Sequence, residues 1–106
     1  MTKHNKMTKH NIRYLPVAED DLNEIVDYLL EHSQQAASNF VDDLERLEEH
    51  LSLFPKTSPL AKDRILRDKG YRTAIVGRYI LFYIVDGNDV FVMRIIHGKR
   101  NYVDLF

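Results

Sequence analysis

The stretch GYRTAIVGRYILFYIVDGNDVFVMRIIHGKR, residues 70–100, carries the strongest structural signal in the chain. It divides into three strand candidates, residues 71–76, 79–85 and 90–96, which are rich in β-branched and aromatic side chains. The segment Asp86-Gly87-Asn88-Asp89 separates the last two candidates, and Gly and Asn readily adopt the positive φ that a tight hairpin turn requires. The sequence therefore predicts consecutive strands joined by short turns.

Alternation along these strands leaves both faces of the predicted sheet largely apolar. We therefore expect helices to cover one face and isolated polar groups, such as Arg78 and Arg94, to lie on the other. On the middle strand, the residues expected to share one face are Tyr79, Leu81, Tyr83 and Val85. On the last strand, they are Val90, Val92, Arg94 and Ile96.

Two amphipathic helices are predicted before this stretch. A helix over residues 17–31 follows Pro16, and its apolar positions recur at helical spacing. A second helix begins after Ser33, a suitable N-cap, and ends before Pro55. Because the link between them is short, the two form an antiparallel helix hairpin.

The remaining segments give weaker signals. Residues 12–15 are a brief strand candidate ahead of the first helix, and a loop bounded by prolines follows the second. Charged and apolar residues alternate ambiguously over residues 60–68, so the pattern does not define one type of element. We assign Arg64 and Arg67 to the start of a strand. In the C-terminal tail, Val103, Leu105 and Phe106 are expected to pack back on the core.

Length and composition indicate one domain. The chain has 106 residues, 44% of them hydrophobic, and we divide it into a flexible tail, residues 1–11, and a single domain, residues 12–106. The tail contains the tandem hexapeptides MTKHNK and MTKHNI, which indicate a second start codon, an artefact or a disordered arm. His4 and His10 are interpreted as solvated side chains rather than metal ligands.

Several functional classes are disfavoured. The sequence has no cysteine and no metal-binding or phosphate-loop motif, so neither a metal nor another cofactor is predicted. No apolar run approaches the roughly 20 residues of a membrane span, and the N-terminus lacks the pattern of a signal peptide. We expect a cytoplasmic protein with no membrane partner.

Charge is distributed unevenly along the chain. Residues 1–54 contain five basic and eleven acidic residues, a net charge of −6, whereas residues 55–106 contain ten basic and five acidic residues, a net charge of +5. Such a distribution can steer an anionic partner to one side, although acidic helices and a basic sheet can equally attract each other.

The combination of Gly70-Tyr71-Arg72, Val76-Gly77-Arg78-Tyr79 and the ending RIIHGKR, residues 94–100, resembles the RelE/ParE superfamily of toxins from bacterial type II toxin–antitoxin modules. The resemblance extends over residues 12–106. It implies an α+β fold of order β-α-α-β-β-β, in which the helix hairpin packs on a mainly antiparallel sheet. It also implies a cognate antitoxin that wraps and silences the toxin, in a possible hetero-oligomer.

Members of the RelE branch cleave messenger RNA on the ribosome without metal, by attack of the ribose 2′-OH on the adjacent phosphate. That chemistry requires cations for the transition state and groups that move protons. This sequence has Ala74 where RelE has a second strand lysine, and Phe106 where RelE has a tyrosine. The resemblance to this branch makes the catalytic candidates Arg72, Arg78, His97, Lys99, Arg100 and Tyr102.

Members of the ParE branch block DNA gyrase and are not hydrolases. The ending RIIHGKR resembles this branch more closely. The net charge of −1 also favours it, because the RelE target site on the ribosome is lined with rRNA and favours basic proteins. The candidates for target binding are then Arg72, Arg78, Arg94, Lys99 and Arg100. A third possibility is a non-toxic binding module that helps an antitoxin repress their promoter.

Two geometric questions follow from these candidates. Both mechanisms require Arg72, Arg78 and Arg100 to converge on one solvent-facing patch, with the acidic helices turned elsewhere. Alternatively, Arg78 and Arg94 pair with acids such as Asp104, and His97 serves only as a hydrogen-bonding residue of a turn.

Overall fold

The computed structural model describes residues 9–106 as an α+β fold in which four strands form one sheet. In chain order the elements are β1 (Asn11–Tyr14), α1 (Pro16–His32), α2 (Gln34–Leu53), α3 (Arg64–Asp68), β2 (Arg72–Val76), β3 (Tyr79–Asp86), β4 (Asp89–His97) and a C-terminal 3₁₀ helix (Val103–Leu105). None of the helices in this part of the chain has the length and apolar character needed to cross a membrane.

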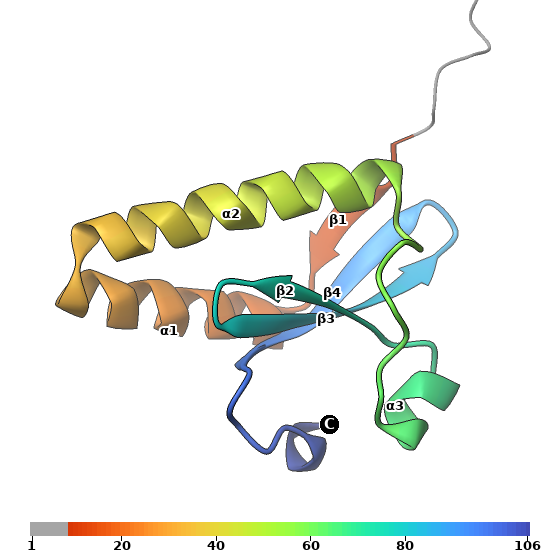
Figure 1. Cartoon of the computed structure of the whole chain (residues 1–106). Coiled ribbons are helices and arrows are strands. Elements are labelled where there is room, and N and C mark those ends of the chain that lie inside the picture. Colours follow the sequence, from red (N-terminus) through yellow and green to blue (C-terminus); the bar gives the residue numbers. More distant parts are fainter. Residues whose placement is uncertain (1–8) are drawn as a thin grey trace, which may run out of the picture.

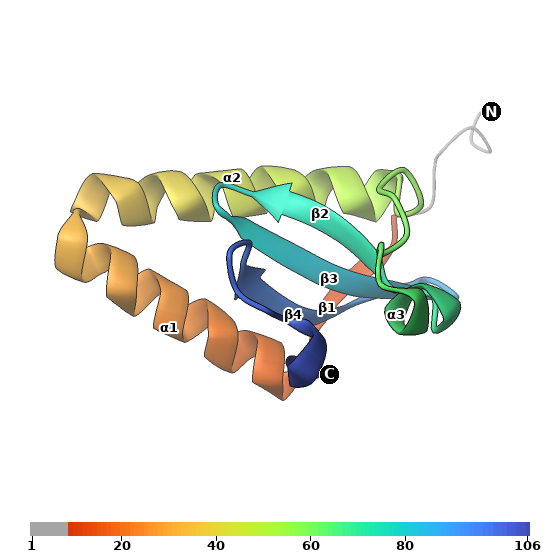
Figure 2. The ribbon, with the colours of Figure 1, turned by 60° about the horizontal axis from the view of Figure 1, so that its bottom comes forward.

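The sheet has the strand order β1-β4-β3-β2 (Figures 1 and 2). β2, β3 and β4 form the predicted antiparallel meander, and β1 pairs with β4 in parallel. Gly87 has a φ of 60° in the turn between β3 and β4, where a side chain would be strained. The prediction of a mainly antiparallel sheet is therefore confirmed.

The helix hairpin forms where the apolar periodicity predicted it. Pro16 starts α1, and Ser33 alone separates the two helices, its hydroxyl oxygen accepting a hydrogen bond from the backbone N–H of Ala36 at 3.1 Å. In Figure 1, α2 lies above the sheet, while α3 and the C-terminal segment lie below it.

Each face of the sheet carries its own apolar core. The core under the helix hairpin joins Ile25, Phe40, Leu44 and Leu51 to inward-facing residues of all three long strands. The opposite core contains Ala61, Leu66, Phe82 and Ile96, with Tyr71, Ile80, Tyr102 and Leu105 packed against them. The expectation that the second face carries isolated polar groups is confirmed for Arg94, which is opposite Phe82 in the register and donates to the Leu105 carbonyl. It is wrong for Arg78, which lies in the turn between β2 and β3, outside both strands.

A β-bulge changes the predicted facing of β4. Tyr83 is opposite Val92 and Phe82 is opposite Arg94, so Met93 is an extra residue in β4. Beyond it the alternation is shifted by one position, and Ile95 joins Val90 and Val92 in the core under the helices. The prediction that Val90, Val92, Arg94 and Ile96 share one face is therefore wrong, whereas the prediction for β3 is confirmed.

The ambiguous segment before β2 contains a short helix rather than a strand. The Asp63 carboxylate accepts a hydrogen bond from the Leu66 N–H at 3.0 Å and caps α3. The assignment of Arg64 and Arg67 to a strand is wrong, because Asp63 provides this cap and Leu66 anchors the helix in the second core.

The two ends of the chain differ in how far the structure tests their predictions. Residues 1–8 of the predicted tail, including His4, lie outside the described residues. Lys9 pairs with Glu49 at 3.2 Å, and the N–H of His10 donates to the Ser52 carbonyl at 2.8 Å. At the other end, the Phe106 ring lies 5.2 Å from Tyr71 and 5.0 Å from Phe82, which confirms that this end packs back; the Val103 side chain is not among those described.

One ion pair joins three parts of the fold. The Asp21 carboxylate on α1 accepts two hydrogen bonds from the Arg94 guanidinium, at 2.8 and 2.9 Å, and a third from the Ile95 N–H at 3.0 Å. Arg94 also donates to the Leu105 carbonyl at 3.1 Å. The hydrogen bonds from Arg94 to Asp21, together with the negative charge of Asp21, raise the pKa of Arg94, and the Arg94 and Asp21 side chains are only 17% and 13% exposed. The partner of Arg94 is thus Asp21, not Asp104.

Replacing Asp21 with Asn should lower the free energy of unfolding by about 2 to 4 kcal/mol, because it leaves a largely buried guanidinium without its counter-charge. Denaturant titration would measure the change. The matched control is Asp20→Asn, which removes an exposed carboxylate from the neighbouring position and should change stability by less than about 0.5 kcal/mol. Equal effects of the two substitutions would contradict this role of Asp21.

A second polar contact joins β1 to α2. The Tyr14 hydroxyl donates a hydrogen bond of 2.5 Å to the Glu48 carboxylate. Burial, together with the neighbouring negative charge of Glu48, raises the pKa of Tyr14 above its ordinary value of 10. The folded chain therefore holds this phenol in its neutral form at pH values where the unfolded chain loses the proton.

Stability should consequently fall as the pH rises above 10, since the unfolded state then releases a proton that the folded state retains. Replacing Tyr14 with Phe should make that fall shallower by about 1.4 kcal/mol per pH unit. Urea unfolding of both proteins between about pH 10 and 11.5 would measure the slopes. Parallel slopes for the two proteins would show that Tyr14 does not contribute.

Candidate functional site

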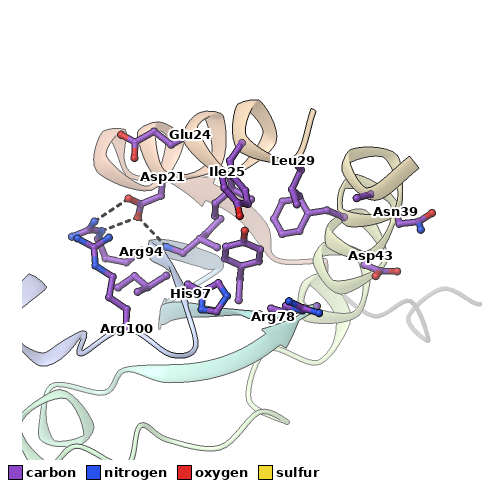
Figure 3. A pocket seen from close by; sticks show the side chains of 17 residues that line it. Asp21, Glu24, Ile25, Leu29, Asn39, Asp43, Arg78, Arg94, His97 and Arg100 are labelled. Atoms are coloured by element: carbon purple, nitrogen blue, oxygen red, sulfur yellow. Dashed lines mark hydrogen bonds and ion pairs between the residues drawn. The ribbon is translucent and has the colours of Figure 1, made fainter. Parts of the chain in front are cut away.

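A groove of about 650 Å³ lies between the helix hairpin and the end of the sheet where β2 turns into β3 and β4 ends. Figure 3 shows Arg78, His97 and Arg100 along its sheet side, and Glu24, Asn39 and Asp43 along its helix side. The groove therefore brings together side chains from the helix hairpin, from the turn between β2 and β3, and from the end of β4 with the segment after it.

The basic side of the groove is built by a close backbone contact. Arg78 follows Gly77, whose φ of 58° allows the tight turn between β2 and β3. The Arg78 carbonyl accepts a hydrogen bond from the Gly98 N–H at 2.9 Å, and a Cβ on Gly98 would lie only 3.3 Å from that oxygen. The pairing of β4 with β3 ends at His97, before Arg100. The contact between Gly98 and Arg78 therefore holds the segment after β4, which carries Arg100, beside the turn that carries Arg78.

Both guanidinium groups are available to a ligand. Arg78 and Arg100 are exposed, and within residues 9–106 neither side chain makes a hydrogen bond or an ion pair. Guanidinium is planar and permanently charged, and it binds carboxylate or phosphate through two parallel hydrogen bonds. The sheet side of the groove is thus suited to binding an anionic group.

The floor of the groove is apolar and aromatic. Ile25, Leu29 and Phe40 come from the helices, and Tyr79 comes from β3, with its ring 5.4 Å from that of Phe40. Burial raises the pKa of Tyr79; the nearby Tyr28 adds to this effect and Arg78 opposes it. Such a floor accepts an apolar side chain next to the anionic group.

The helix side carries negative charge, so the expectation that the acidic helices face elsewhere is wrong. Asp43 pairs with Arg46 at 2.5 Å and Asp21 pairs with Arg94, which leaves Glu24 as the acidic lining residue without an ion pair in the described part of the chain. The groove has two charged sides of opposite sign. A bound ligand would therefore be oriented with its acidic group toward the positively charged sheet side.

Arg72 does not lie in this groove. Its guanidinium donates to the backbone carbonyls of Lys56 at 3.3 Å and Ser58 at 2.8 Å, and so holds the loop after α2. Arg72 is the first residue of β2, and four steps of extended chain at about 3.3 Å each place it about 13 Å from Val76, where the turn that carries Arg78 begins. The predicted convergence of Arg72 with Arg78 and Arg100 is therefore wrong for Arg72, whereas Arg78 and Arg100 line the same groove.

The other candidates are divided between the groove and the interior. The Arg94 guanidinium is committed to Asp21 and Leu105, although the residue lines the groove. The Tyr102 ring packs 5.0 Å from Phe82 in the second core, on the other face of the sheet. Lys99 is exposed but does not line the groove. Arg94 and Tyr102 thus make contacts within the fold.

His97 lines the groove with its ring 5.3 Å from that of Tyr79. Its Nδ1 accepts a hydrogen bond from the Lys99 N–H at 3.1 Å, and its carbonyl accepts one from the Arg100 N–H at 3.0 Å. These bonds match the predicted hydrogen-bonding role in a turn. They also position the segment that carries Arg100.

Sequence reasoning missed the apolar and aromatic part of the site. Tyr28, Asn39 and Phe40 line the groove, and Tyr28 is 55% exposed. An exposed tyrosine adjoining the apolar stripe of α1 is the signal that could have found it. No group of three or more His, Cys, Asp or Glu residues between residues 9 and 106 could hold a metal ion.

Comparison with known proteins assigns this chain to a family. The family model described as "ParE toxin of type II toxin-antitoxin system, parDE" matches residues 12–102. A search of curated proteins finds no match.

Solved structures show the same fold. The chain is similar to a structure titled as the chromosomal ParDE TA system from P. aeruginosa, with 18% identity and a TM-score of 0.66 over 87% of this chain and 99% of that one. It is also similar to the toxin–antitoxin complex RelBE2 from Mycobacterium tuberculosis, with 21% identity and a TM-score of 0.59 over 87% of this chain and 94% of that one. Because the family model covers most of the residues, the chain belongs to the ParE toxin family of type II toxin–antitoxin systems.

Proposed function

We propose that this chain, as a single toxin domain over residues 12–106, inhibits bacterial growth by acting on DNA gyrase in the cytoplasm and is neutralised by a cognate antitoxin. Membership of the ParE family supports the toxin role. The observation that carries the choice of mechanism is the groove in which Arg78 and Arg100 lie free beside an apolar floor. Such a site binds a protein segment that has an apolar and an acidic residue.

The internal positions of the other candidates support binding rather than RNA cleavage. Cleavage needs cations around one phosphate, together with groups that transfer protons. Arg72 and Arg94 are bound to groups of the chain itself, and Tyr102 packs in the second core. Only Arg78, His97 and Arg100 remain together, and the Nδ1 atom of His97 already accepts a backbone hydrogen bond.

Two related structures support a neutralising partner. One related structure is a ParDE system and the other is a toxin–antitoxin complex. By analogy we propose that this chain forms a hetero-oligomer with its own antitoxin and that the complex is the resting form of the toxin.

The test is a supercoiling assay with purified gyrase and the purified chain. We expect inhibition by the wild type, and a double variant Arg78→Ala/Arg100→Ala should need an at least about 100-fold higher concentration, because each of the two charged hydrogen-bonded contacts contributes about 1.5 to 3 kcal/mol. Lys62→Ala/Lys69→Ala is the matched control. It removes two exposed positive charges outside the groove and should inhibit like the wild type.

Growth and messenger RNA should be followed in parallel after induction. Arrested growth with intact supercoiling and codon-linked cuts in translated messages would overturn the gyrase mechanism in favour of ribosome-dependent cleavage. Unimpaired growth in the presence of the folded, antitoxin-free chain would instead indicate a non-toxic binding module.

A further inference from the structure

The charges that line the groove do not all cancel within the chain. Three lining residues are acidic and three are basic: Asp21, Glu24, Asp43, Arg78, Arg94 and Arg100. Arg94 pairs with Asp21 at 2.8 Å, and Asp43 pairs with Arg46, which does not line the groove. The charges that remain within the described residues are those of Arg78 and Arg100 on the sheet side and that of Glu24 on the helix side.

Glu24 is an exposed carboxylate at one end of the groove. Within residues 9–106 its side chain makes no hydrogen bond or ion pair. Figure 3 shows it at the same end as Arg100, with the pair of Asp21 and Arg94 between them. The pKa of Arg94 is raised first by its hydrogen bonds to Asp21, and the charge of Glu24 adds to this effect. Glu24 therefore contributes to the electrostatics of this end of the groove.

A partner that covers the groove has to satisfy this carboxylate. An ionised carboxylate that loses its water without gaining a counter-charge strongly opposes binding. A lysine or arginine of the partner would supply both the counter-charge and charge-assisted hydrogen bonds. A partner without such a cation would leave Glu24 unpaired and would bind less tightly.

The alternative role of Glu24 is to weaken the positive field of Arg78 and Arg100. Its charge would then repel the acidic group of any ligand, and removing it would strengthen binding. The geometry favours contact with a partner cation, because Glu24 and Arg100 form no ion pair with each other and both are exposed. The two roles predict effects of opposite sign.

The floor of the groove lies between the two charged sides. The rings of Phe40 and Tyr79 form part of it, and their centroids are 5.4 Å apart. A segment with an apolar side chain on this floor presents its neighbouring groups to the free guanidinium groups on one side and to Glu24 on the other. Nucleic acid is a poor occupant, since each of its phosphates is negative and would be repelled by Glu24.

We propose that Glu24 determines which segment of gyrase the groove accepts, by binding a lysine or arginine of that segment while Arg78 and Arg100 bind its acidic groups. This inference rests on the proposed function, which supplies gyrase as the target. The segment recognised has an apolar residue with an acidic group on one side and a cation on the other. A purely acidic segment is rejected by the same carboxylate.

The test measures binding to purified gyrase and inhibition of supercoiling for variants of Glu24. Glu24→Gln removes the charge and keeps the size of the side chain, and it should raise both the Kd and the inhibitory concentration about 10-fold. Glu24→Lys should raise them by about 100-fold or more, because it also sets two cations against each other.

The matched controls are Glu31→Gln and Glu31→Lys. Glu31 is an exposed glutamate on the same helix, but it does not line the groove. The controls change the net charge of the chain by the same amounts, so they correct for general electrostatic attraction to gyrase. Both should bind and inhibit like the wild type.

Salt dependence gives a second readout, which a loss of folding would not reproduce. If Glu24 binds a cation of gyrase, the affinity of Glu24→Gln should fall less steeply with NaCl concentration than that of the wild type. If Glu24 repels an acidic group, the fall should be steeper. The midpoint of denaturant unfolding should be the same for the two proteins, because Glu24 is exposed.

The outcomes separate this inference from the proposed function. Tighter binding or stronger inhibition by Glu24→Gln would overturn the inference alone, because the carboxylate would then only repel the ligand. Equal behaviour of the Glu24 and Glu31 variants would also overturn it and leave gyrase as the target. A wild-type chain that neither binds nor inhibits gyrase would overturn both.

Discussion

The ion pair between Asp21 and Arg94 holds the parts of this fold in register. Asp21 lies on α1, while Arg94 lies on β4 just beyond the bulge at Met93. The same carboxylate accepts the Ile95 N–H at the edge of β4, where the short strand β1 has already ended. One side chain thus replaces a strand partner, neutralises a largely buried guanidinium and fixes the distance between the helix hairpin and the sheet.

The distance between the helix hairpin and the sheet determines the size of the groove between them. The helices contribute the apolar floor and the acidic side, and the turn after β2 and the end of β4 contribute the free cations. The hydrogen bond between Gly98 and the Arg78 carbonyl brings the last two segments together. Since most acids on the helix side are paired and the cations opposite them are not, the net attraction of the groove is for an anion next to an apolar group.

Arginines in this chain serve two different purposes. Arg72 and Arg94 satisfy internal acceptors, and each organises a neighbouring segment: Arg72 the loop after α2, and Arg94 the C-terminal 3₁₀ helix. Arg78 and Arg100 lie at segment ends, where the chain offers them no acceptor among the described residues.

Local patterns determined the elements of this protein. Helical periodicity, Pro16 at the start of α1 and the N-cap Ser33 defined the hairpin, and β-branched residues around Gly77 and Gly87 defined the meander. These signals are carried by residues close together in the chain, so they can be read without a structure. The family resemblance and the presence of Arg78 and Arg100 in one groove were also predictable, because both rest on that order of elements.

Only the tertiary structure decided which of the charged residues are free. The bulge at Met93 shifts the facing of β4, and Asp21 then becomes the partner of Arg94 from 73 positions away. Likewise, the loop carbonyls that bind Arg72 are backbone groups, which have no signature in the sequence. A guanidinium looks the same in a sequence whether it is bound or free, and the difference depends on contacts between residues far apart in the chain.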